Sequence, residues 1–146
     1  MSSVISRRNA VAALVASIAA TATDGAYLTL IRSQDVTAPH PAVVPFVVVY
    51  IAGVAVAGVA SVVLILREQQ GTAKTVLMAA ATGSAALGFL AIFSIGLGLL
   101  ITAGLFGMAA YGMAPTASRM PQLIAALGAL GFLIAGFTVT GVFWGS

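Results

Sequence analysis

Long apolar stretches dominate this chain, and the longest runs from Val76 to Met113. These 38 residues include no formally charged side chain. A segment of roughly 18 or more apolar residues is long enough to cross a hydrocarbon core of ~30 Å. The pattern therefore places the protein in a lipid bilayer.

The central stretch is too long for one ordinary span. A continuous helix of this length would measure about 57 Å and would need a tilt of about 60°. We expect it to break at Ser94-Ile95-Gly96-Leu97-Gly98, because each of the two glycines weakens a helix by about 1 kcal/mol. This predicts spans over 75–95 and about 97–113. The second is short, so a re-entrant half-helix, with four spans in total, is the alternative.

Three further apolar segments complete the prediction, and short polar segments separate them. Between the second and third spans, Gly71 suits the end of one helix and Thr72 the cap of the next. We predict a single all-α domain, a polytopic transmembrane bundle over residues 1–146. Its spans are about 10–31, 45–66, 75–95, 97–113 and 121–144.

Composition supports a membrane location and excludes several other classes. Hydrophobic residues make up 61% of the 146 positions and charged residues only 6%, whereas a soluble domain carries about 25% charged residues. The few basic residues lie in predicted loops, so no basic patch with interleaved aromatics can bind nucleic acid. The absence of cysteine excludes disulfides, thiolate metal ligands and cysteine nucleophiles.

Basic residues also indicate orientation, because lysine and arginine concentrate in cytoplasmic loops. With five spans, all basic residues except Arg32 fall on the side of the N-terminus. With four spans, Arg119 would move to the other side. We therefore expect a multi-pass protein of the cell membrane with a cytoplasmic N-terminus and an external C-terminus.

Asp24 is the one ionisable side chain clearly within a predicted span. A charged carboxylate near the bilayer centre costs roughly 2.5 to 3.5 kcal/mol on insertion scales. Ser17, Thr21 and Asp24 are spaced i, i+4, i+7 and so share one narrow helix face. We expect this polar site to point into the bundle or at a partner protein. It can serve a hydrogen-bonded structural role, or it can couple protons or cations.

Small residues four apart mark several helix faces. This spacing lets helix backbones approach closely, which matters because lipid gives helices no hydrophobic drive to associate. We expect these residues to pack inside the bundle, with docking onto a partner subunit or within a homo-oligomer as the alternative. The candidates are Gly53, Ala57, Ala80, Ser84, Gly88, Ala103, Gly107, Gly131 and Ala135.

No catalytic or cofactor-binding motif is recognisable in the sequence. His40 is the only histidine, and with Asp35 it supplies at most a fragment of a metal site, since metals usually need three or four ligands. We therefore expect no catalytic residue, cofactor or metal. The favoured function is a non-catalytic accessory or assembly subunit of a larger membrane complex. The alternative is a proton-coupled small-molecule transporter that uses Asp24, and an enzyme acting on lipid ranks third.

Two short motifs stand out in the apolar segments, Asp24-Gly25-Ala26-Tyr27 and the segment from Phe93 to Leu100. In these motifs the chain resembles small, alanine-rich multi-pass proteins of actinobacterial membranes. This resemblance implies a bacterial inner membrane and supplies no activity. The acid in the first span also resembles that of small multidrug transporters, which would imply exchange of protons for cationic substrates. The chain differs from those transporters in having Asp in place of Glu and an additional span.

Overall fold

The structure is a computed structural model that describes residues 2–34, 42–91, 96–113 and 119–140. All regular secondary structure in these ranges is helical, so the predicted all-α class is confirmed. The described chain forms five helices, as predicted. They are α1 (Ser2–Gln34), α2 (Val43–Leu66), α3 (Gln70–Leu90), α4 (Gly96–Tyr111) and α5 (Met120–Val139).

Four of these helices are long and apolar enough to cross a membrane. The qualifying segments in the described chain are Arg7–Ser33, Val43–Leu66, Gln70–Leu90 and Met120–Val139. Helix α4 has only 16 residues, which correspond to about 24 Å against a hydrocarbon core of ~30 Å. Multi-pass insertion therefore follows from α1, α2, α3 and α5, and a full crossing by α4 stays a prediction.

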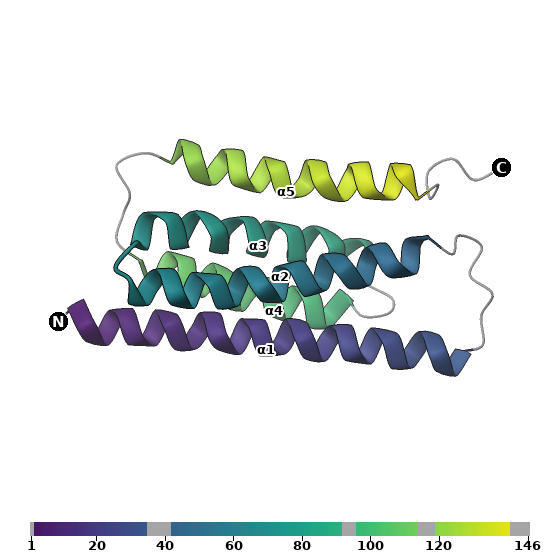
Figure 1. The fold of residues 1–146 in the computed structure, drawn as a ribbon, viewed down its shortest axis with the longest axis horizontal. Helices are drawn as coiled ribbons and strands as arrows, with labels where there is room; N and C mark the ends of the chain where they lie inside the picture. The colour runs from purple at the N-terminus through teal and green to yellow at the C-terminus, as the bar shows by residue number, and fades with distance from the viewer. Residues whose placement is uncertain (1, 35–41, 92–95, 114–118, 141–146) are drawn as a thin grey trace.

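Helices α1 to α4 form a closed ring (Figure 1) in which the contacting pairs are α1–α2, α2–α3, α3–α4 and α4–α1. Helix α5 lies outside this ring and packs mainly against α3. Consecutive helices run in opposite directions, so α1 begins at one end of the bundle and α5 ends at the other. The ring therefore has a shared core, whereas α5 is an addition to one of its sides.

One end of the bundle carries most of the basic residues. At this end α1, α3 and α5 begin and α2 and α4 end (Figure 1). Arg32 is in the last turn of α1, at the opposite end. The charge asymmetry expected from the sequence thus agrees with the directions of the helices. The basic residues at the first end are Arg7, Arg8, Arg67, Lys74 and Arg119.

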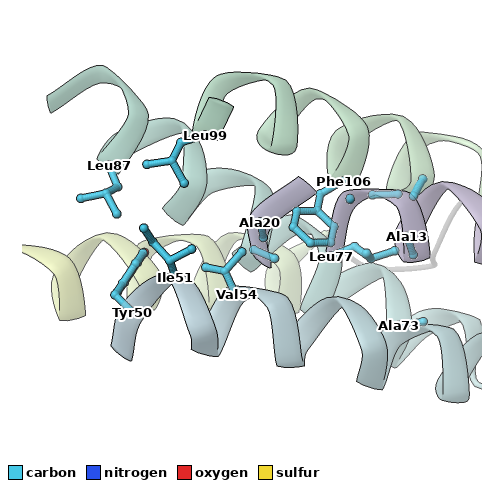
Figure 2. Close-up of a cluster of buried hydrophobic side chains, with 14 of the residues drawn as sticks. Ala13, Ala20, Tyr50, Ile51, Val54, Ala73, Leu77, Leu87, Leu99 and Phe106 are labelled. Atoms are coloured by element: carbon cyan, nitrogen blue, oxygen red, sulfur yellow. The ribbon is translucent and has the colours of Figure 1, made fainter. Parts of the chain in front are cut away.

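The core of the ring combines small side chains from α1 with larger ones from its neighbours (Figure 2). Ala13, Ala16 and Ala20 of α1 are completely buried. Because alanine projects little from a helix, α1 lies close to α2 and α4, and bulkier side chains fill the centre. The large side chains that are almost completely buried are Ile51, Ile65, Leu77, Leu87, Leu99 and Phe106.

Helix α3 ends earlier than the sequence predicted. Helix α3 ends at Leu90 and not near residue 95, and α4 already includes both Gly96 and Gly98. Residues 94 and 95 of the predicted break lie outside the described residues. The backbone N–H of Gly96 donates to the carbonyl of Ala91 at 2.8 Å, and a Cβ on Gly96 would collide with the carbonyl oxygen of Gly88. The glycine therefore permits close helix contact and does not terminate a helix.

Other predicted boundaries also shift. Helix α1 begins at Ser2 and not near residue 10, because the preceding polar residues continue the helix. Helix α5 ends at Val139 and not near residue 144, and residues 141–146 lie outside the described chain. Gly71 and Thr72 both lie in the first turn of α3, so their predicted roles as helix end and cap are wrong. Instead, Glu68 adopts a φ of 62° after α2 and reverses the chain.

Candidate intramembrane polar site and helix-contact surfaces

Ser17, Thr21 and Asp24 share a face of α1, but their surroundings differ. Ser17 is buried, and its hydroxyl donates to the carbonyl of Ala13 at 2.9 Å. Thr21 is exposed, and its hydroxyl donates to the carbonyl of Ser17 at 3.0 Å. Asp24 is half-buried, and its Oδ1 is enclosed without a hydrogen-bond partner. Of the three predicted site residues, only the acid has an enclosed oxygen without a donor.

Contacts between α1 and α2 define the level of Asp24 in the bundle. A Cβ on Gly58 would touch the hydroxyl of Ser17, so these residues face each other across an antiparallel helix pair. Seven residues further along α1, about 10.5 Å, Asp24 is level with Ile51 of α2, which is completely buried. Arg32 lies about 12 Å beyond Asp24 on the same helix. All other basic residues of the described chain lie at the opposite end of the bundle, so none is level with Asp24.

Many hydroxyl groups are hydrogen-bonded within their own helix. They donate to a carbonyl three or four residues earlier, which satisfies the hydroxyl without a second helix. Ser84 is different, because its side chain is completely buried and its Oγ has no hydrogen-bond partner. The sequence offers Ser84 both as a small packing residue and as one of several possible hydrogen-bond partners of Asp24, and nothing in its local sequence predicts a hydroxyl without a partner. The common arrangement is seen at Ser17, Thr21, Thr23, Ser61, Thr82 and Thr102.

Some of the predicted packing residues do lie inside the bundle. Ala80, Ser84 and Gly88 of α3 and Ala103 of α4 are buried. The contact at Gly88 is tight, since a Cβ there would lie 3.0 Å from a backbone oxygen and 3.1 Å from a backbone nitrogen of the facing α4 segment. Backbone atoms of two packed helices have little freedom to move apart, so a larger residue at this position would strain the contact between α3 and α4.

Most of the remaining predicted packing residues do not bring helices of the described chain together. A Cβ added at Gly53, Gly107 or Gly131 would meet no atom within 4 Å. Ala57 is half-buried and packs against the core, whereas Ala135 is exposed on α5. Glycine and alanine occur on every side of these helices, so their spacing did not separate inward from outward faces.

Glycines outside the predicted set make several of the helix contacts. A Cβ on Gly58 of α2 would lie 2.7 Å from the ring of Phe106 of α4. A Cβ on Gly83 of α3 would touch the hydroxyl of Tyr50 of α2. In each case a single glycine accommodates one larger side chain from a neighbouring helix. Such pairs need no repeat of small residues, so a four-residue spacing does not reveal them.

Aromatic side chains join α5 to α2 at the end of the bundle where α2 begins and α5 ends. The rings of Phe46 and Phe137 have centroids 5.5 Å apart and meet edge to face at 70°. Those of Tyr50 and Phe132 are stacked with centroids 6.2 Å apart. The ring of Phe46 also lies against Gly136. These contacts hold one end of α5 against the ring of four helices.

Two apolar grooves open on the sides of the bundle. The first, of about 780 Å³, lies between α1 and α2 and includes Ser17 and Thr21 in its lining. The second, of about 550 Å³, lies between α2 and α5 over α3 and includes Tyr50, Ala57 and Phe132. The lining of both grooves is almost wholly apolar. Both therefore suit hydrocarbon chains or apolar helices.

Metal-ligating side chains do not cluster in the part of the chain that the structure describes. No group of three or more His, Cys, Asp or Glu side chains there is arranged to hold a metal ion. Asp35 and His40, the fragment of a site considered from the sequence, lie outside the described residues.

The fold and the polar site define a small multi-pass membrane protein. Its class follows from the ring of four helices with an attached fifth and from the four segments able to cross a bilayer. Comparison with known protein families, with curated proteins and with solved structures finds no match.

Proposed function

We propose that this protein is a non-catalytic accessory or assembly subunit of a larger membrane complex. The observation that supports this most is the position of Asp24, an acid within a candidate span whose side chain is only half-buried by the described chain. Ionisable groups within membrane spans usually pair with one another or with backbone carbonyls. A second membrane protein that packed against the exposed part of the Asp24 side chain would supply such a group.

Exposed small residues on α5 also favour association with another helix. Gly128, Gly131 and Ala135 are all exposed, and a Cβ at either glycine would meet no atom within 4 Å. Their spacing of three and four residues brings them to one side of the helix. Small residues on a lipid-facing helix allow a second backbone to come close.

The distribution of polar groups supports binding more than chemistry. Catalysis generally needs several polar groups that converge on one reacting atom. Ser17 and Thr21, the hydroxyl residues in the larger groove, are both hydrogen-bonded within α1. That groove is otherwise lined by apolar side chains, which suit contact with a helix or a lipid chain.

In the proposed arrangement, the basic end of the bundle faces the cytoplasm. The N-terminus is then cytoplasmic and the C-terminus external, in a bacterial inner membrane. The enrichment of lysine and arginine in cytoplasmic segments supports this direction, because five of the six basic residues share that end.

Purification from the native membrane in a mild detergent tests the proposed function. We expect the tagged protein to elute with a second membrane protein as a complex of defined size. An unrelated multi-pass protein with the same tag provides the control for adventitious capture. A strictly monomeric protein without any companion above that control would refute an accessory role.

Proton-coupled transport is the second candidate, and the position of Asp24 within a candidate span favours it. Acids inside the membrane are typical members of the proton relays of pumps and transporters. A homo-oligomer would then be needed to build a pathway. Reconstituted vesicles should show proton flux driven by a substrate gradient, and Asp24→Asn should abolish it. Transport that continues unchanged in this variant would remove Asp24 from the mechanism.

A further inference from the structure

Two arginines lie beyond one end of the α1–α2 groove, one on each of the helices that form it. Arg7 of α1 precedes Leu14 of the lining by seven residues. Arg67 follows Ala60 of the lining by seven residues, and its backbone N–H donates to the carbonyl of Val63 at 3.0 Å, so it continues the last turn of α2. Seven residues are nearly two full turns, about 10.5 Å. Each arginine therefore shares the face of its helix that borders the groove.

The two arginines are level with each other. Ser17 of α1 faces Gly58 of α2, and these helices are antiparallel (Figure 1). From this contact, Arg7 is about 15 Å back along α1 and Arg67 about 13.5 Å further along α2. Both therefore reach the same end of the bundle at nearly the same height. Because the axes of packed helices are ~8–10 Å apart, both long side chains can contact one group held between them.

This pair lies at the edge of the hydrocarbon core. The candidate span of α1 begins at Arg7, and that of α2 ends at Leu66, immediately before Arg67. Both arginine side chains are exposed. Lipid phosphates lie at this boundary, and a guanidinium group can donate two parallel hydrogen bonds to a phosphate. The site therefore combines two phosphate-binding groups with an apolar groove that leads into the membrane.

Charge decides between the possible occupants of the groove. Arg8 is exposed beside Arg7, whereas the acid at this corner is Glu68, which is also exposed. Three positive charges thus face one negative charge. An apolar helix would leave the arginines without an anion, and a zwitterionic lipid brings a cation of its own. An anionic lipid brings both a net negative charge and a hydrocarbon chain.

The length of the groove also suits a lipid chain. One leaflet contributes half of the hydrocarbon core, ~15 Å. This distance along α1 from Arg7 reaches Ser17, which belongs to the lining. An acyl chain whose phosphate lies at the arginines would pass Leu14 and Ala60 and fill the nearer part of the groove. The lining there is almost wholly apolar.

We propose that Arg7 and Arg67 bind the phosphate of an anionic glycerophospholipid, and that one acyl chain of this lipid lies in the α1–α2 groove. The two guanidinium groups donate to phosphate oxygens from neighbouring helices, so the lipid joins α1 to α2 at the basic end of the bundle. Leu14 and Ala60 border the first part of the chain. The site needs no second protein, so it is independent of the proposed accessory role.

Native mass spectrometry of the full-length protein in a mild detergent tests this proposal, because it resolves each bound lipid by mass. The protein is mixed with equal amounts of phosphatidylglycerol and phosphatidylcholine that have identical acyl chains and differ only in the headgroup. We expect phosphatidylglycerol to bind in preference to phosphatidylcholine. Arg7→Gln and Arg67→Gln should each reduce this preference about fivefold, the contribution of one basic residue near the membrane surface.

Two matched controls separate the site from general attraction. Arg8→Gln removes the same charge one residue further along α1, about 100° around the helix from Arg7, and should leave the preference unchanged. Ala60→Phe fills the groove where the chain enters it and should weaken binding of phosphatidylglycerol. Ala135→Phe, on the exposed side of α5, introduces the same side chain away from the groove and should have no effect.

Four results would overturn the inference. Equal binding of the two lipids would remove the anionic headgroup, and equal losses in Arg7→Gln and Arg8→Gln would indicate diffuse attraction in place of a site. Full binding in Ala60→Phe would show that no acyl chain lies in the groove. Glycerol 3-phosphate has the phosphate without the chains and should not displace the lipid. Displacement at an equal concentration would indicate a site for soluble phosphates.

Discussion

Gly88 of α3 and Gly96 of α4 lie in direct backbone contact, so that a Cβ on Gly88 would be 3.0 Å from the carbonyl oxygen of Gly96. The two residues join the halves of the long apolar stretch into an antiparallel hairpin. This hairpin supplies two of the four helices of the ring. The close contact between α3 and α4 is the reason that glycine occurs at both positions.

Gly96→Ala should destabilise the protein, because the new methyl group would collide with backbone atoms of Gly88 and Ala91. We expect a loss of about 1 to 3 kcal/mol, the usual effect of overpacking. Gly104→Ala is the matched control on α4, since a Cβ there meets no atom within 4 Å. It should be neutral or slightly stabilising. Reversible unfolding in mixed micelles with increasing dodecyl sulfate measures both, and equal stabilities would argue against the close contact.

Gly58→Ala should loosen the junction of α1, α2 and α4. The added methyl group would meet the hydroxyl of Ser17 and the buried ring of Phe106, and a loss of about 1 to 3 kcal/mol is expected. Gly53→Ala is the control on the same helix, where the space is open. If thermal denaturation in detergent gave the two variants the same midpoint, the register between α1 and α2 would be wrong.

Phe46→Ala should release one end of α5 from the bundle. Phe46 contacts Phe137, Phe132 and Tyr50, and each aromatic pair contributes about 0.5 to 1.5 kcal/mol beyond burial. Hydrogen exchange followed by mass spectrometry should show faster exchange in the last turns of α5 and little change in α4. Phe89→Ala removes a phenylalanine that is 73% exposed on α3 and should leave α5 unchanged. Equal exchange rates in the last turns of α5 in the two variants would contradict the role of the aromatic contacts of Phe46.

Cysteine labelling should determine whether α4 crosses the membrane. Ser33→Cys and Gln69→Cys are exposed at opposite ends of the bundle, so an impermeant thiol reagent should reach them from opposite sides of sealed vesicles. Arg119→Cys, just before α5, should react on the same side as Gln69→Cys if α4 crosses. Reaction together with Ser33→Cys would instead support the four-span alternative. Gly96 is unsuited to such labelling because a side chain there collides with the backbone.

Much of the fold could be predicted from the pattern of apolar and polar residues. Hydropathy and charge are local properties, and they located all five helices, with errors of several residues at their ends. The site was harder to predict. Spacing brought Ser17, Thr21 and Asp24 to one face of α1 but could not show that both hydroxyls bond to their own helix. It also grouped Gly88, which packs closely against α4, with Gly131, which contacts nothing nearby.

The amino-acid sequence by itself determined that this is an all-helical membrane protein with one acid within a span, because crossing a bilayer depends on the length and polarity of each segment alone. Only the tertiary structure decided that four helices close a ring with α5 outside it. It also decided that Ser17 and Phe106 pack against Gly58, and that Ser84 and Asp24 each have an oxygen without a donor. The physical reason is that inward and lipid-facing sides of these helices are both apolar. Hydropathy therefore does not distinguish the two sides of a helix, whereas the packing of side chains between helices does.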